Sequence, residues 1–178
     1  MKQEILNFRF ENKKDFFITS KNALAVDFIQ KWPEWNNQLF FLYGSSKCGK
    51  TSLGEIWQTK SEAKIFDKKK IKKIFSKDNN FNYIHENNWI LDNVDIFLKK
   101  KNNDEILLNF INILLEKKKS FFFMTSKKPP NILSSNIKDL LSRISSALVV
   151  RVYEPDNILL GKIIKKYLEE RAIKIEKK

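Results

Sequence analysis

The chain has 178 residues, of which 42% are hydrophobic, enough for one globular domain with a buried core. No run of about 18 apolar residues is present to cross a membrane, and residues 1–4 lack the apolar stretch of a signal peptide. The single cysteine, Cys48, excludes an internal disulfide, and the single histidine, His85, excludes a metal site built from histidines. We therefore expect a cytoplasmic protein without a membrane segment.

The formal net charge of +13 raises the question of nucleic-acid binding. Lysine runs occur at 68–70, 99–101 and 117–119, each near the end of a predicted element. Asn, Ile, Phe and Lys are abundant and Arg is scarce, as an AT-rich genome would produce. Because diffuse charge attracts DNA without specificity, we favour compositional bias over a dedicated DNA-binding face and expect at most non-specific contact.

Strands and helices are predicted to alternate along the chain. In order, the predictions are a polar arm over 1–14, a helix over 20–31 with Ser20 as N-cap, a strand over 39–43, a helix following Thr51, a strand over 63–66, a helix over 69–75, a strand over 89–92, a helix over 105–116, a strand over 120–125, a helix over 139–144, a strand over 148–152 and a helix over 156–171. This alternation predicts an α/β fold with a mostly parallel sheet covered on both faces.

A phosphate-binding loop follows the first buried strand. The octet Gly44-Ser45-Ser46-Lys47-Cys48-Gly49-Lys50-Thr51 fits the pattern G-x-x-x-x-G-K-[ST], and it contains two of the four glycines in the chain. Glycine lets the backbone turn its N–H groups around a phosphate chain, and the following helix, entered at Ser52, presents its N-terminus to the same anion. Lys50 is predicted to reach the β- and γ-phosphates and Thr51 to bind Mg²⁺. Cys48 occupies a variable position, where a small filler suffices. The motif predicts binding of ATP or ADP.

The strand over 89–92 ends in Asp92, about 40 residues after the loop, where a Walker B aspartate is expected to hold Mg²⁺ beside Thr51. The alternative is that Asp92 only caps a turn. Asn93 follows, and an amide can hydrogen-bond a water but cannot accept its proton, so intrinsic hydrolysis is expected to be slow. Thr125 and Ser126 end the next buried strand, where a hydroxyl could sense the γ-phosphate or simply begin the turn before Pro129.

Arg143 is one of only four arginines among 34 basic residues. Where composition favours lysine, a retained arginine hints that the planar guanidinium is needed. A finger acting on a neighbouring subunit's nucleotide and an ordinary surface ion pair are equally open on this evidence.

Together these segments resemble the AAA+ ATPase core of the bacterial initiator DnaA, and most of all its Hda (HdaA) regulatory relatives. The resemblance covers almost the whole chain. The segments that carry it are Asp15-Phe16-Phe17-Ile18, Ser20-Lys21-Asn22-Ala23, Trp32-Pro33-Glu34-Trp35, the loop through Trp57, Leu91-Asp92-Asn93-Val94-Asp95, Thr125-Ser126-Lys127-Lys128-Pro129-Pro130, Asp139-Leu140-Leu141-Ser142-Arg143-Ile144 and Glu154-Pro155-Asp156.

The resemblance implies a three-layer αβα P-loop core with a five-stranded sheet. It implies an extended arm over 1–14, the core over 15–154 and the beginning of a helical lid over 155–178, with the rest of the lid and its sensor 2 arginine missing. It implies that Phe16, Phe17 and Asn22 lie against the adenine, that Ser126 belongs to sensor 1, and that Arg143 is the arginine finger, acting in trans.

Gln3, Leu6 and Phe8 match the hexamer by which Hda proteins dock on the sliding clamp, although Q-x-x-L-x-F alone is weak and a disordered arm or an edge strand is the alternative. The implied function is an adapter that, with DNA-loaded clamp, stimulates ATP hydrolysis by DnaA at the replisome. A homodimer is possible within this interpretation. A helicase loader or another stand-alone ATPase is the second interpretation, and an interaction module whose nucleotide never turns over is the third.

Overall fold

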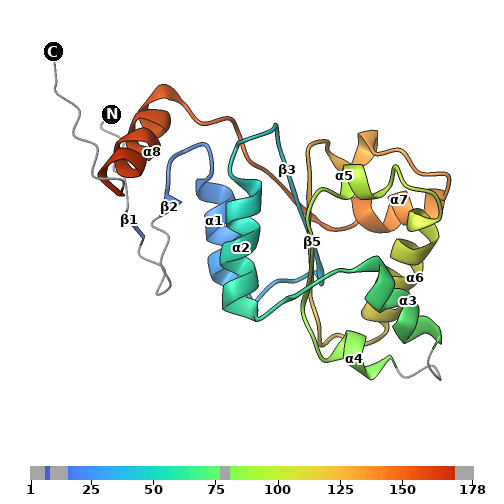
Figure 1. The fold of residues 1–178 in the computed structure, drawn as a ribbon. Coiled ribbons are helices and arrows are strands. Elements are labelled where there is room, and N and C mark those ends of the chain that lie inside the picture. The colour runs from blue at the N-terminus through green and yellow to red at the C-terminus, as the bar shows by residue number, and fades with distance from the viewer. Residues whose placement is uncertain (1–6, 9–15, 77–80, 171–178) are drawn as a thin grey trace, which may run out of the picture.

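A five-stranded parallel sheet runs through the centre of the molecule (Figure 1). The computed structural model describes residues 7–8, 16–76 and 81–170. Its strands are β3 (Leu39–Tyr43), β4 (Lys64–Ile65), β5 (Trp89–Leu91), β6 (Phe122–Ser126) and β7 (Leu148–Arg151), in the spatial order β4-β5-β6-β3-β7. The prediction of an α/β fold with a five-stranded, mostly parallel sheet is confirmed.

The three central strands are apolar along almost their whole length because both faces of the sheet are covered. β6 lies between β3 and β5, with Tyr43 in register with Ser126 and Leu91 in register with Met124. The loop strand β3 and the aspartate strand β5 are therefore separated by one strand. The residues that follow β3 and β5, and those that end β6, meet at one edge of the sheet.

Two layers of helices sandwich the sheet, on the left and right of Figure 1. One face is covered by α1 (Ala23–Lys31) and α2 (Lys50–Ser61), and the other by α3 (Lys68–Ser76), α4 (Asn82–His85), α5 (Val94–Phe97), α6 (Asn103–Glu116) and α7 (Lys138–Ser145). α8 (Asn157–Glu170) follows β7 and lies near the short hairpin of β1 (Asn7–Phe8) and β2 (Phe16–Phe17). This is the predicted three-layer arrangement. Within the described part of the chain, no helix combines the length and apolar character needed to cross a bilayer.

Stacked aromatic rings fill the core beneath α1 and α2. The Trp57 ring lies parallel to those of Trp35 and Phe123, with centroids 5.6 Å and 5.1 Å away, and Trp35 also stacks on Phe40 at 4.7 Å. Trp57 comes from the helix that begins at Lys50, whereas Phe40 and Phe123 come from the sheet. The aromatic core therefore anchors the helix that leaves the predicted phosphate loop.

Several helix boundaries differ from the predictions. α1 begins at Ala23, after a turn in which the Thr19 carbonyl accepts the N–H groups of Asn22 and Ala23, so Ser20 is not the N-cap. The inward face of α6 also differs slightly from the helical pattern of the sequence, which predicts Ile113 on that face. Leu107, Ile111 and Leu114 are buried, whereas Ile113 is only half-buried. The short α4, α5, the 3₁₀ turn Pro130–Ile132 and the strand β2 were not expected, since four-residue or shorter elements leave too little periodicity to detect.

His85 on α4 is buried and makes folding stability depend on pH. Burial lowers its pKa, and Lys117 acts in the same direction, while the Glu116 carboxylate, 3.8 Å from Nε2, opposes them. As the pH falls below about 6.5, the unfolded chain binds a proton at this imidazole more readily than the folded chain does. We expect the free energy of unfolding to decrease from pH 7 to pH 5.5, with a slope of at most about 1.4 kcal/mol per pH unit from this group. Urea unfolding of wild type and His85→Gln checks this: the His85→Gln curve should be flatter, and parallel curves would contradict it.

Candidate nucleotide-binding site

The predicted phosphate loop joins β3 to α2 and has the backbone geometry that its glycines allow. Gly49 has φ 98°, in the left-handed region, and Lys47 also has positive φ, at 64°. A Cβ on Gly44 would lie 2.2 Å from the Val152 carbonyl oxygen, so only glycine fits where the loop passes the end of β7. The loop is thus a tight, inward-turning backbone segment.

The ammonium of Lys50 lies inside this loop. Its Nζ donates to the carbonyl oxygens of Gly44, at 2.8 Å, and Ser45, and it contacts Cys48 Sγ at 3.6 Å. Both Lys50 and Cys48 are buried, and Cys48 fills the space beneath the loop. Ser46 and Lys47 are exposed at the loop tip, and Ser52 is half-buried in the first turn of α2. A cation in the hollow of the loop is the arrangement that phosphate binding requires.

A cluster of oxygen ligands lies beside the loop. The Thr51 hydroxyl donates to Asp92 Oδ2 at 3.3 Å, and the Thr125 hydroxyl donates to Asp92 Oδ1. The strand order produces this cluster, because β6 brings Thr125 between the loop helix and the end of β5. The structure therefore brings together Thr51 and Asp92, the two predicted magnesium ligands.

This oxygen pair fits Mg²⁺. Mg²⁺ is usually held by one or two carboxylates together with substrate phosphates and water, rather than by a cage of protein groups. Among the described residues, no group of three or more His, Cys, Asp or Glu side chains could hold a metal alone. Thr51 and Asp92 would therefore hold the ion together with a phosphate chain in the loop.

Asn93 follows Asp92 in the left-handed conformation, at φ 57° and ψ 56°. Its backbone N–H donates to Thr125 Oγ1 at 2.9 Å, and its side-chain amide donates to Asp92 Oδ2 at 2.8 Å. The next carboxylate along the chain, Asp95, accepts the backbone N–H of Lys127 at 3.1 Å. The Thr51–Asp92–Thr125 cluster thus contains one carboxylate, and an amide stands where a second acid could act as a base.

The two hydroxyls that end β6 point to opposite faces of the sheet, as successive strand residues do. Thr125 faces Asp92, whereas Ser126 Oγ lies 3.4 Å from Asp95 Oδ1 and accepts the Lys128 N–H at 3.0 Å. The predicted sensor residue Ser126 therefore ends β6 on the side of Asp95, and Thr125 contacts Asp92, the predicted magnesium ligand. The side-chain alternation along β6 is the sequence signal that could have separated the two.

The segment before α1 lies against the loop. The Phe16 ring is 3.8 Å from the position that a Cβ on Gly49 would take. Asn22 is buried and fixes the segment, since its side chain donates to the Phe17 carbonyl and accepts the Thr19 N–H. Lys166 of α8 lies 6.0 Å from the centre of the Phe17 ring. Of the three residues expected near adenine, Phe16 adjoins the loop, Phe17 adjoins α8 and Asn22 holds the backbone between them.

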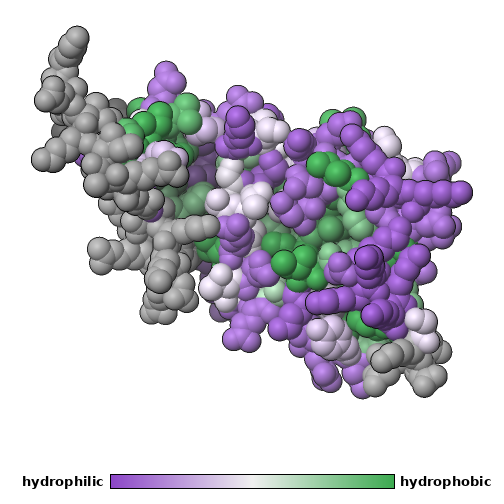
Figure 2. All heavy atoms as spheres, viewed as in Figure 1, coloured by the Kyte–Doolittle hydropathy of each residue, from purple (hydrophilic) through white to green (hydrophobic). Residues whose placement is uncertain are grey.

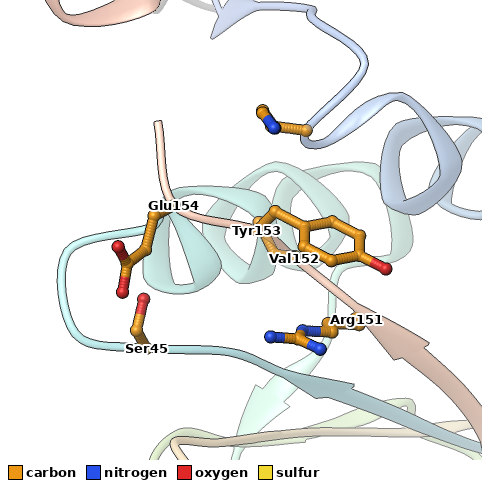
Figure 3. A pocket seen from close by; sticks show the side chains of 6 residues that line it. Ser45, Arg151, Val152, Tyr153 and Glu154 are labelled. Atoms are coloured by element: carbon orange, nitrogen blue, oxygen red, sulfur yellow. The ribbon is translucent and has the colours of Figure 1, made fainter. Parts of the chain in front are cut away.

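A cavity of about 340 Å³ opens next to the loop (Figure 3). Lys21, Ser45, Arg151, Val152, Tyr153 and Glu154 line it. Ser45 Oγ is buried there without a hydrogen-bond partner among the described residues, and the Arg151 guanidinium lies 4.6 Å from the centre of the Tyr153 ring. Of these residues, only Ser45 was predicted to belong to the site. The scarcity of arginine could have drawn attention to Arg151 as it did to Arg143.

The structure does not bring the remaining predicted residues that it describes, Arg143 and Phe8, into contact with Thr51, Asp92 or Thr125. Arg143 is exposed on α7, where its Nε lies 3.7 Å from Asp139 Oδ1, one helical turn earlier. Phe8 belongs to β1 and is in register with Phe16 of β2. Gln3 and Leu6 lie outside the described residues.

Solved structures with a similar fold include several of DnaA. The crystal structure of a DNA replication initiation factor matches with a TM-score of 0.75 at 22% identity, over 90% of this chain and 55% of that one. AMPPCP-bound DnaA from Aquifex aeolicus matches with a TM-score of 0.71 at 21% identity, over 91% and 56%. Domain III of DnaA from Thermotoga maritima matches with a TM-score of 0.72 at 20% identity, over 91% and 75%. The chain therefore has the AAA+ P-loop fold, and it spans about half the length of the first two proteins.

Comparison with curated proteins gave no match. Residues 6–151, however, match the family model of the bacterial DnaA ATPase domain. This match includes the phosphate loop, the Asp92 strand and α7, so it covers the site as well as most of the chain. The protein therefore belongs to the bacterial DnaA ATPase domain family.

Proposed function

We propose that this protein binds ATP or ADP with Mg²⁺ and acts as an Hda-type adapter that switches off DnaA. The observation that carries the proposal is the arrangement at the phosphate loop: Lys50 is buried in the loop, the Thr51 hydroxyl lies 3.3 Å from Asp92 Oδ2, and Asn93 places an amide beside Asp92. This arrangement suits tight holding of a nucleotide and poor hydrolysis of it. A protein of this kind acts on its partner protein in a way that depends on whether the adapter itself has ATP or ADP bound.

Each residue has a defined task in this proposal. The loop N–H groups and Lys50 bind the phosphate chain, and Thr51 and Asp92 hold the magnesium ion, which neutralises phosphate charge when bound. Thr125 orients Asp92 through its hydroxyl. Asn93 can position a water molecule but leaves its proton in place, because a neutral amide is not a base. The cavity beside Ser45 leaves room for the rest of the nucleotide.

Support from relatives concerns the family and the fold. The Aquifex aeolicus DnaA structure contains AMPPCP, an ATP analogue, and its fold resembles that of this chain. The family match extends over the Lys50, Asp92 and Arg143 segments. The Hda-specific part of the proposal comes from Asn93, from Arg143 and from the resemblance of the Gln3–Phe8 segment to a clamp-binding hexamer.

Arg143 is the residue through which the protein would act on DnaA. It is exposed on α7, and its charge is balanced by one exposed carboxylate, Asp139, in an i,i+4 pair that costs little to break. The Arg143 guanidinium can therefore exchange this ion pair for the phosphates of ATP bound to a neighbouring subunit. Arginine fingers in that position increase the rate of hydrolysis about 10³- to 10⁵-fold. The clamp would hold the adapter near DnaA at the replisome in the cytoplasm.

The test is turnover of DnaA-bound ATP in the presence of DNA-loaded clamp. Wild-type protein should accelerate turnover, Arg143→Ala should lose about a hundredfold or more of that acceleration, and Lys138→Ala, an exposed cation on the same helix, should keep it. Equal activity of wild type and Arg143→Ala would exclude the finger.

A clamp pull-down with Phe8→Ala separates the adapter from a helicase loader, because a loader predicts no dependence on Phe8.

Intrinsic hydrolysis is expected to be slow because of Asn93. Asn93→Asp keeps the size of the side chain and tolerates the left-handed backbone, and it supplies the missing base. We expect single-turnover hydrolysis to increase by about a hundredfold or more, the lower end of the range that a general base contributes. Quenched-flow measurement with radiolabelled ATP checks this. A wild-type rate like that of an ordinary ATPase would refute the assignment of Asn93.

A further inference from the structure

We propose that binding of the sliding clamp and binding of nucleotide weaken each other, and that the strand β2 couples the two events. This inference rests on the proposed function, since it takes the Gln3–Phe8 segment as the clamp-docking hexamer. Phe8, the last residue of that hexamer, belongs to β1 and is in register with Phe16 of β2. β2 in turn lies against the phosphate loop. One short strand thus touches both the end of the docking segment and the loop that would hold the nucleotide.

The Phe16 ring makes the contact between β2 and the phosphate loop. Its Cε2 and Cζ atoms lie 3.8 Å from the position that a Cβ on Gly49 would take. Gly49 is the N-cap of α2, where the loop turns into the helix, and the N–H groups of this turn would bind the phosphates. On the other side of Phe16, the Phe17 carbonyl accepts the side-chain amide of the buried Asn22 at 2.9 Å. A shift of β2 therefore changes the packing at the start of α2.

α8 is also in contact with β2. Lys166 lies 6.0 Å from the centre of the Phe17 ring. Figure 2 shows hydrophobic residues on the surface over α8, and Leu160, Ile163 and Ile164 of this helix are exposed. α8 is thus only partly packed against the rest of the described chain, so its contact with β2 contributes much of its attachment. Movement of β2 reaches α8 as well as the loop.

Pairing of β1 with β2 and docking on the clamp compete for the same residues. β1 consists of Asn7 and Phe8, which lie opposite Phe17 and Phe16 in an antiparallel pair. Opposite residues in such a pair are about 4.5–5.5 Å apart between Cα atoms, which leaves no room for a protein surface between the strands. An extended peptide that docks in a groove is enclosed by its partner. A groove that encloses Phe8 therefore separates β1 from β2.

Thermodynamic linkage gives this competition its sign and its symmetry. A nucleotide in the loop favours the β2 position that the structure shows, and this position supports pairing with β1. Release of β1 to the clamp then costs more free energy when nucleotide is bound. Because a coupling free energy is reciprocal, the clamp weakens nucleotide binding by the same factor, and such factors are typically about 5- to 150-fold. The clamp would thus release the adapter more readily when nucleotide is bound.

The experiment measures the dissociation constant of the full chain for the sliding clamp of the same organism, without nucleotide and with saturating MgADP. Wild-type protein should bind the clamp at least about fivefold more weakly with MgADP. Asn7→Pro removes a backbone N–H from β1 at a variable position of the hexamer, so it should keep clamp binding and lose the effect of MgADP. The matched control is Glu4→Pro, at another variable position and outside β1, which should keep the effect.

The outcomes separate this inference from the proposed function. No clamp binding under any condition would remove the adapter function itself. Clamp binding that MgADP leaves unchanged, or strengthens, would overturn the coupling and leave the adapter in place. Retention of the full MgADP effect in Asn7→Pro would exclude β1–β2 pairing as its cause. Titration of a fluorescent ADP analogue with and without clamp should give the same factor, and a circular dichroism melt of each variant verifies the fold.

Discussion

Lys50→Ala should abolish measurable nucleotide binding, with a loss of about a hundredfold or more in affinity for ADP and ATP. The Lys50 ammonium is the one cation buried in the phosphate loop within the described chain, and its removal takes away the charge that binds the phosphates beside the backbone N–H groups. Hydrogen bonds from an ammonium to phosphate oxygens are about twice as strong as neutral ones, so the loss of this side chain should weaken nucleotide binding strongly. Titration of a fluorescent ADP analogue in the presence of Mg²⁺ measures the effect.

The control for this variant is Lys73→Ala, an exposed lysine on α3, far from the loop. Its ADP affinity should equal that of the wild type within about twofold, since an exposed charge beyond a Debye length is screened. If Lys50→Ala bound ADP as tightly as Lys73→Ala, the phosphate loop would not be a nucleotide site. A circular dichroism melt of both proteins separates loss of binding from loss of fold.

Trp57→Ala should be the most destabilising single substitution in the core, with a cost of about 3–5 kcal/mol in the free energy of unfolding. The Trp57 side chain is fully buried and stacks on Trp35 and Phe123, so alanine leaves a cavity between α2 and the sheet. Aromatic stacking adds about 0.5–1.5 kcal/mol per pair beyond the buried area. Urea unfolding followed by circular dichroism measures the change.

Two companion variants make this result specific. Trp57→Phe keeps a ring in the stack and removes a buried indole N–H that has no partner among the described residues, so its cost should be below about 2 kcal/mol. Leu24→Ala removes a side chain that is 58% exposed on α1 and should change stability by no more than about 0.5 kcal/mol. A Trp57→Ala cost no larger than that of Leu24→Ala would contradict the aromatic core described here.

Trp57 also links stability to the site. It lies in the helix that starts at Lys50, and its ring holds that helix against β6, whose Thr125 orients Asp92. The helix approaches the sheet closely because Gly54 has no side chain, since a Cβ there would lie 3.0 Å from Ile90 Cδ1. Loosening this contact should therefore displace Thr51 from Asp92 as well as reduce stability.

Much of the site could be predicted from the sequence because its signals are local. The loop depends on two glycines, a lysine and a threonine at fixed spacing, and Asp92 ends an apolar run. The alternation of strands and helices likewise predicted a parallel sheet with covered faces, which the structure confirms. The match of residues 6–151 to the DnaA ATPase domain family agrees with the resemblance that these segments carry.

The sequence by itself determined that Lys50 and Thr51 would close a phosphate-loop pattern and that Asp92 would end a buried strand, because loops and strand ends depend on neighbouring residues. Only the tertiary structure decided that β6 lies between β3 and β5, and hence that a residue of β6 contacts Asp92; the alternation of side chains along the strand then assigns this contact to Thr125. The same is true of the cavity beside Ser45 and of the contact between β2 and the phosphate loop. These features depend on which distant segments pack together, and packing is set by the shape of the whole core rather than by any local pattern.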